Sequence, residues 1–243
     1  MTLISFCGVT RTVQNARQVT KTLLRGIDWK CEPQSRIAIL SANQSEADSF
    51  LECAAGTVPV QQGKVITDGR VSWPLGETEA LLGVLTPNQN AAFLQRIYGC
   101  KLKREEQLQL IRQLSDFNAD LYDKPLKLST SAMKSRLRLA ISLAFDFDLY
   151  VVPKMPAWPF RSSNLRAQRF KAAFEKATFG KAILVSNPNP FFQDAYCDKA
   201  VVIENGSLAL EGDLSFCRDW LNERVSKSRE YVEIPHFEEP LSA

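Results

Sequence analysis

Three short apolar runs constrain the fold of this chain more than any other feature of its sequence. They span Arg36–Leu40, Leu149–Val152 and Ala182–Val185. Continuous apolar runs of this length are typical of strands buried on both faces. A polar loop, residues 41–45, follows the first run, and apolar residues at helical spacing follow from about residue 48. Buried strand, loop and helix in this order are typical of P-loop proteins, so the chain is predicted to have an α/β fold.

The length and composition fit one sizeable domain. The chain has 243 residues, of which 45% are hydrophobic, which suits one large α/β domain or one domain with a small inserted lobe. Thirty Lys and Arg against 27 Asp and Glu give a net charge of only +3. A balance this mild argues against nucleic acid or an acidic membrane surface as the main partner.

The remaining segments give a coarse map of the chain. Strands are expected over residues 22–30 and, around the Asp68-Gly69 turn, within residues 61–73. The pattern predicts helices over residues 88–115, from residue 131 onward and over residues 164–178, and a hairpin turning at Asn205-Gly206. One domain is therefore predicted over residues 1–223, with a helical lobe at about 83–146 and a polar, poorly ordered tail over 224–243.

Targeting signals and metal sites are not apparent. No apolar run approaches the roughly 20 residues that cross a bilayer, and the first residues lack the pattern of a secretory signal. The six cysteines form no CxxC pair, and His236 is the single histidine. The chain is therefore expected to be cytosolic, reduced and without a metal.

The order and spacing of seven stretches resemble one family. Over roughly residues 20–215 the chain is similar to the ABC ATPase subunits that energise export of capsular or O-antigen polysaccharide in Gram-negative bacteria. The stretches are LLRGIDW, AILSANQSEADSFLECAAGTVPVQQGKV, VSWPLG, LTPNQNAAFLQRIYG, STSAMKSRLRLAISLAFDFDLYVV, AILVSN and VVIENGSLALEGD. The stretches Trp73-Pro74-Leu75-Gly76 and Met133-Lys134-Ser135-Arg136-Leu137 are distinctive of the polysaccharide exporters. The resemblance implies a P-loop NTPase-like ABC nucleotide-binding domain with a RecA-like core, an antiparallel β subdomain and an inserted helical lobe.

The resemblance also implies a P-loop, which this chain departs from. The family pattern G-x-x-x-x-G-K-[ST] wraps phosphates with glycines, neutralises them with lysine and holds Mg²⁺ with a hydroxyl. The matching positions hold Ser41, Glu46, Ala47 and Asp48. One unit-charge repulsion at ~4 Å in a surface-like dielectric costs about 4 kcal/mol, so Glu46 is expected to oppose a triphosphate. The vestigial loop is assigned to Ser41, Asn43, Ser45 and Ser49.

The other nucleotide motifs are replaced as well. The family's second core strand ends in an Asp-Glu pair. Pro153 and Lys154 occupy these two positions here, and neither can act as the general base. The remaining family positions are the switch histidine, the glutamine that links to the membrane subunit, the signature glycine and the aromatic that stacks on adenine. Asn187 stands at the switch histidine and Leu82 at the glutamine. Ala132 stands at the signature glycine and Thr22 at the aromatic position.

These replacements predict a pseudo-ATPase that is not an enzyme and binds neither ATP nor Mg²⁺ tightly. It would act as a structural or regulatory subunit of a polysaccharide exporter, cytoplasmic and peripheral to the inner membrane. Its partners would be an ABC membrane subunit, an active ATPase subunit or both, in a homodimer or heterodimer, with no nucleic acid. The alternatives are a cytosolic scaffold or regulator of the same ancestry and, with little support, an enzyme with a relocated site.

Three further features carry open alternatives. Phe93 and Tyr98 match the region where the family docks its membrane subunit, although both residues are equally suited to packing inside the lobe. Lys134, Arg136 and Arg138 suit a phosphate or lipid, although a solvated helix face explains them more simply. The stiff stretch around Pro156, Trp158 and Pro159 either contacts a partner or fills the vacated site.

Overall fold

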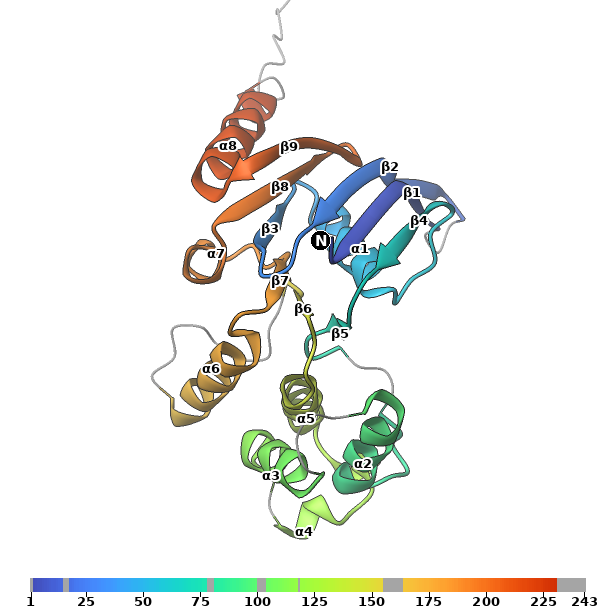
Figure 1. Cartoon of the computed structure of the whole chain (residues 1–243), viewed down its shortest axis with the longest axis vertical. Coiled ribbons are helices and arrows are strands. Elements are labelled where there is room, and N and C mark those ends of the chain that lie inside the picture. The colour runs from blue at the N-terminus through green and yellow to red at the C-terminus, as the bar shows by residue number, and fades with distance from the viewer. Residues whose placement is uncertain are drawn as a thin grey trace, which may run out of the picture.

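A computed structural model shows two β-sheets and a set of helices that extends from them (Figure 1). It describes residues 2–14, 18–77, 81–99, 104–117, 119–154 and 164–230. The stretch around Pro156, Trp158 and Pro159, and the tail from residue 231 with His236, lie outside these residues.

The larger sheet has six strands, and all three apolar runs lie in it. Its order is β5 (Val71–Pro74), β6 (Leu149–Val152), β7 (Ala182–Val185), β3 (Arg36–Leu40), β8 (Lys199–Glu204) and β9 (Ser207–Asp213). The first five strands are parallel, and β9 pairs antiparallel with β8 through the turn at Asn205-Gly206. Every residue of β6 and β7 is buried, as expected for parallel strands covered on both faces.

A second, antiparallel sheet packs on the first helix. Its order is β2 (Thr20–Cys31), β1 (Ile4–Gln14) and β4 (Gln62–Thr67), and helix α1 (Gln44–Ala55) shares its core. The rings of Phe6 and Phe50 stack at 4.5 Å between centroids, and Trp29 meets both rings edge-on. This aromatic contact fixes α1, and with it the loop that precedes α1, against the antiparallel sheet.

The helical lobe lies at one end of the molecule's long axis, and α8 (Leu214–Glu230) lies at the other end (Figure 1). The lobe contains α2 (Pro87–Tyr98), α3 (Arg104–Ser115), α4 (Ala119–Tyr122), the 3-10 turn η1 (Leu126–Leu128) and α5 (Ser131–Ala144). Trp73 from β5 joins it to the large sheet, because its indole Nε1 donates to the buried Ser142 Oγ at 2.7 Å. A continuous apolar core runs from the lobe to the face of the sheet.

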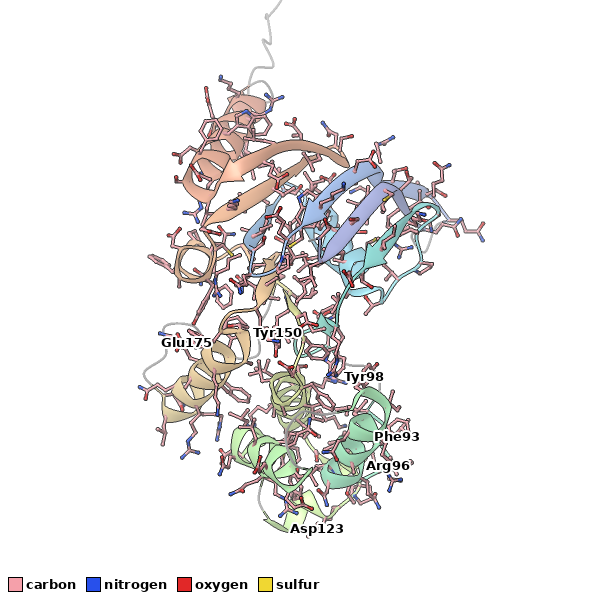
Figure 2. All side chains as sticks on the ribbon, viewed as in Figure 1. Phe93, Arg96, Tyr98, Asp123, Tyr150 and Glu175 are labelled. Carbon is pink, nitrogen blue, oxygen red and sulfur yellow. The ribbon has the colours of Figure 1, made fainter. Side chains whose placement is uncertain are left out.

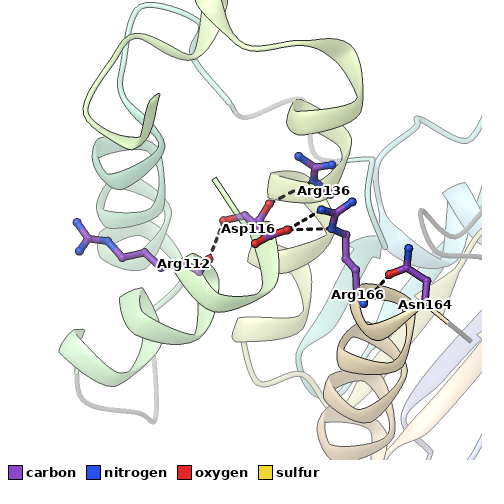
Figure 3. Close-up of polar contacts among 6 residues, drawn as sticks. Arg112, Asp116, Arg136, Asn164 and Arg166 are labelled. Atoms are coloured by element: carbon purple, nitrogen blue, oxygen red, sulfur yellow. Dashed lines mark hydrogen bonds and ion pairs between the residues drawn. The ribbon is translucent and has the colours of Figure 1, made fainter. Parts of the chain in front are cut away.

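The remaining helices, α6 (Leu165–Thr178), α7 (Pro190–Tyr196) and α8, follow the core strands. Figure 3 shows one link between α6 and the lobe: the Arg166 guanidinium contacts the Asp116 carboxylate, with Nη2 to Oδ2 at 2.6 Å. Beside it, Arg136 Nε donates to the Ser115 carbonyl at 3.2 Å. No helix in the described part of the chain is both long and apolar enough to cross a membrane.

Several expectations need correction. Residues 88–115 form two helices and not one segment, because α2 ends at the C-cap Gly99, whose φ is 67°. The strands β4 and β5 flank the Asp68-Gly69 turn but lie in different sheets. β1 was not predicted; its repeated register shifts disturb the period-2 alternation that identifies a strand in sequence. Helix α8 continues past the expected boundary at residue 224 to residue 230.

Candidate functional site

The loops that follow β3, β6 and β7 meet at one edge of the large sheet. They bring the P-loop positions, Pro153 with Lys154, and Ser186 with Asn187 together. In open parallel sheets, ligands bind at the carboxyl ends of the strands. This edge is therefore the candidate site, and most of the residues expected from the sequence lie there.

The side chain of Glu46 folds back into the loop that precedes α1. Its Oε2 accepts a hydrogen bond from Ser41 Oγ at 2.9 Å, and its Oε1 accepts one from Asn43 Nδ2 at 3.2 Å. Glu46 is only 6% exposed, and it lies in the first turn of α1, where the helix dipole favours an anion. The carboxylate thus uses polar donors and a helix end that would otherwise be available to a phosphate.

Asp48 is held in a second polar cluster. Its Oδ1 accepts hydrogen bonds from Ser186 Oγ and from Gln44 Nε2, both at 2.9 Å. Gln44 Nε2 also donates to the Ser186 carbonyl at 2.8 Å. The cluster ties the start of α1 to the end of β7, and one oxygen of the Asp48 carboxylate is already engaged.

Beyond Asp48 lies a small hollow of about 90 Å³. It is lined by Asp48, Leu51, Glu52, Pro74, Glu77, Pro153, Lys154 and Ser186. Burial, and then the neighbouring carboxylates, raise the pKa of Glu77 above its ordinary value. Burial also raises the pKa of Glu52, against a smaller lowering effect of Arg11. The hollow therefore brings three carboxyl groups and Lys154 together where the family pattern places the γ-phosphate and its metal.

A larger hollow of about 740 Å³ opens on the other side of the P-loop. Thr22, the position expected to stack on adenine, lines it together with Lys21, Arg25, Asn205 and Glu46. Its other lining residues are Val13, Gln14, Val19 and Thr20. The two cations were not identified from the sequence, where Lys21 and Arg25 stand simply as exposed residues of a strand.

The other expected positions have local roles. Asn187 is 6% exposed, and its Oδ1 accepts from Asn189 N at 2.9 Å, so it shapes the turn into α7. Ala132 is exposed in the first turn of α5, where Thr130 is the N-cap. Leu82 is 46% exposed on the lobe and does not line either hollow. Of the remaining P-loop serines, Ser45 is exposed and Ser49 is buried.

The residues present do not fit a phosphate-bound Mg²⁺ in the usual way. Ala47 offers no cation, and the Glu46 carboxylate takes up two of the loop's donors. Among the described residues, no group of three or more His, Cys, Asp or Glu is arranged to hold a metal ion. That the chain binds neither ATP nor Mg²⁺ tightly remains a prediction.

Comparison with known proteins places the chain among export cassettes. It is 30% identical over 203 residues to the ATP-binding protein BexA of Haemophilus influenzae, covering 84% of this chain and 91% of that protein. It is also 30% identical to the capsule polysaccharide export ATP-binding protein CtrD of Neisseria meningitidis, covering 85% and 93%. The polysialic acid transport ATP-binding protein KpsT of Escherichia coli is 29% identical over 170 residues, or 70% of this chain and 74% of that protein. No protein-family model matches the chain.

Solved structures give the same fold. A dimeric ATP-binding cassette bound to ADP and Pi superimposes with a TM-score of 0.66 at 13% identity, covering 87% of this chain and 99% of that one. An ATP-binding subunit of an ABC transporter superimposes equally well at 17% identity, covering 95% and 98%. At these identities the likeness establishes the fold alone, and it confirms the predicted cassette architecture.

The comparison contradicts one prediction, that the chain is not an enzyme. The relatives that cover most of it are named ATP-binding proteins, and the activity of this family is ATP hydrolysis coupled to transport. The residues predicted from the sequence to be motif replacements do not place the chain outside the ATPases. By sequence and by fold, the chain belongs to the ATP-binding subunits of ABC transporters that export capsular and related polysaccharides.

Proposed function

We propose that the chain works in a polysaccharide exporter as the cassette subunit that docks on an ABC membrane subunit. One observation carries this proposal: 30% identity extends over 84–85% of the chain and over 91–93% of two relatives, one of them named for capsule polysaccharide export. Placement beside the inner membrane, and pairing with a second cassette, identical or not, are parts of the same proposal.

Two exposed side chains on α2 support the docking role. Phe93 is 40% and Ile97 is 58% exposed, and their spacing of four residues puts them on one stripe of the helix. Figure 2 shows Phe93 and Arg96 on the outer side of α2. Tyr98 is 44% exposed, but its ring packs against Trp73 with centroids at 5.0 Å, and this contact favours the alternative of packing inside the lobe. The docking stripe is therefore assigned to Phe93 and Ile97.

The second part of the proposal is that this chain's own P-loop binds ATP and Mg²⁺ weakly. The Glu46 carboxylate, bonded to Ser41 and Asn43, supports it, because an incoming phosphate has to displace a charged group that is already paired. A second subunit that supplies a complete P-loop would let the exporter bind ATP at the other site.

Affinity purification of the tagged chain from native membranes, followed by mass spectrometry, tests the docking role. An ABC membrane subunit should co-purify, and Phe93→Ser with Ile97→Ser should deplete it. Tyr98→Phe, which keeps the ring on Trp73, is the control and should retain it. Recovery of only non-membrane partners, or equal recovery with all variants, would contradict the proposal.

A further inference from the structure

The hollow of about 740 Å³ beside the P-loop is lined by two cations that have no carboxylate partner among the described residues. Lys21 and Arg25 stand four residues apart on β2, and both are exposed. Glu46, the acid in the lining, is already bonded to Ser41 and Asn43. The wall of the hollow therefore offers positive charge that no described side chain neutralises.

The charge of this region is one-sided in the sequence as well. Residues 1–27 contain four Lys or Arg and no Asp or Glu. The next residue, Asp28, accepts a backbone hydrogen bond at 2.8 Å. Glu204, which precedes the lining residue Asn205, accepts a hydrogen bond from Arg224 Nε at 2.8 Å. The acids nearest along the chain to these cations and to Asn205 are thus engaged by other groups.

The same hollow also has an apolar part. Val13 and Val19 line it, and Val19 is 59% exposed. Thr20 and Thr22 add methyl groups beside their hydroxyls. A ligand that suits the whole hollow therefore carries apolar groups together with negative charge, because a bare anion would leave the aliphatic wall in water.

The stretch of chain that follows α8 has this composition. Residues 231–243, which we call the acidic segment, contain three Glu and no Asp, Lys or Arg. Their apolar residues include Tyr231, Ile234 and Phe237. The acidic segment lies outside the part of the chain that the structure describes. Its glutamates and apolar residues complement the two kinds of surface in the hollow.

The end of α8 lies close enough for the acidic segment to reach the hollow. Helix α8 packs along β8 and β9 (Figure 1), and its Arg224 bonds Glu204, the residue before Asn205 in the lining. From Arg224 the helix continues to Glu230, a rise of about 9 Å at 1.5 Å per residue. Residues 231–243 span up to roughly 43 Å when extended, so their length does not limit the contact.

The cations on α8 itself are not available to the acidic segment. Arg224 pairs with Glu204, and Lys227 pairs with Glu223 with Nζ to Oε1 at 2.7 Å. Arg218 pairs with an aspartate of α7. These are all the cations of α8 whose side chains the structure describes, so the unpaired charge in the hollow is the better match.

We propose that the acidic segment binds in the hollow beside the P-loop of its own chain. Its glutamates contact Lys21 and Arg25, and its apolar side chains cover Val19. The contact itself depends on neither nucleotide nor export. One consequence rests on the proposed function: because Thr22 stands at the position expected to stack on adenine, the bound segment competes with a nucleotide at this subunit.

Photo-cross-linking in the full chain tests the contact. A benzophenone amino acid in place of Phe237 keeps an aromatic group and reacts on irradiation with the residues that it touches. The product should join position 237 to residues 13–25 or to the turn at Asn205, and mass spectrometry of the digested protein locates it. Mixing the chain with an isotopically labelled copy separates cross-links within one chain from those between two copies.

Charge reversal identifies the cations that hold the acidic segment. Lys21→Glu with Arg25→Glu should lower the cross-link yield at least about threefold, because each lost ion pair shifts the equilibrium toward the unbound segment. Glu238→Lys with Glu239→Lys in the same background should restore the yield. Raised salt should lower the yield of the wild type.

A matched control separates the hollow from overall charge. Lys30→Glu with Lys64→Glu reverses two exposed cations of the same antiparallel sheet that do not line the hollow, and it should leave the yield unchanged. An equal loss in this control would overturn the proposal, as would cross-links only elsewhere on the chain or only between copies. Thermal unfolding of each variant confirms that it is folded. Because neither ATP nor a membrane subunit enters the experiment, its failure would leave the docking proposal standing.

Discussion

The buried strands and the loops at their carboxyl ends differ in what they retain of the family pattern. Strands β6 and β7 are buried along their whole length, and β3 has only Arg36 partly exposed. The loops that leave the same strands carry Glu46, Pro153 with Lys154, and Asn187 at the positions where the sequence predicts the family's phosphate-binding and catalytic groups to be replaced. The scaffold and the site chemistry are thus specified by different residues, and one can change while the other is kept.

The largest effect should come from breaking the scaffold. Phe50 is fully buried and stacks on Phe6, so Phe50→Ala should lower the free energy of unfolding by about 3–5 kcal/mol. Phe179→Ala, at 86% exposure, should change it by less than about 0.5 kcal/mol. Urea denaturation measures both, and similar values for the two variants would contradict the assignment of this core.

A smaller loss of folding stability is expected from a substitution where the large sheet joins the lobe. Trp73→Phe keeps an aromatic ring but removes the Nε1 donor to Ser142 Oγ, which should cost about 0.5–1.5 kcal/mol, because the buried hydroxyl loses one partner and keeps Gly76 N and the Arg138 carbonyl. Ser142→Ala should cost less in this background than in the wild type, because only its hydrogen bonds with Gly76 N and the Arg138 carbonyl remain to be lost. Full additivity of the two substitutions in denaturant melts would show that the bond contributes nothing.

The small hollow that Glu52 and Glu77 line predicts a pH dependence of stability. The pKa values of Glu52 and Glu77 are raised above 4.5, so the folded state holds these protons more tightly than the unfolded state. Their contribution is fully present below pH 4.5 and is lost as the pH rises through the raised values. Glu52→Gln with Glu77→Gln should flatten this fall and unfold at a higher temperature than the wild type at pH 7. An unchanged pH profile would show that the two carboxylates do not share a desolvated site.

The smallest effect is expected at the link between α6 and the lobe. Asp116 and Arg166 are about half exposed, so Arg166→Ala should cost less than about 1 kcal/mol and the loss should shrink in high salt. Lys227→Ala removes one member of the more exposed surface pair with Glu223, and it should cost still less. A loss of several kcal/mol on Arg166→Ala would mean that the link holds the lobe in place.

Periodicity and turn chemistry predicted much of the fold. The three apolar runs, the hairpin at Asn205-Gly206 and α5 after Thr130 are all present. β1 was not predicted because its irregular pairing weakens the alternation of buried and exposed residues. The end of α2 at Gly99 was not predicted because polar residues with helical spacing lie on both sides of it. In the site, the sequence located the altered positions. That Glu46 turns inward onto Ser41, and that Glu52, Glu77 and Lys154 line one hollow, depends on tertiary packing that no local pattern encodes.

Calorimetric titration with ATP and Mg²⁺ tests the central claim most directly, that the Glu46 carboxylate takes the place of a phosphate in the P-loop. The wild type should bind more weakly than about 0.1 mM, and Glu46→Gly with Ala47→Lys should tighten binding at least about tenfold. Micromolar binding by the wild type that is lost on Glu46→Gly would contradict the account.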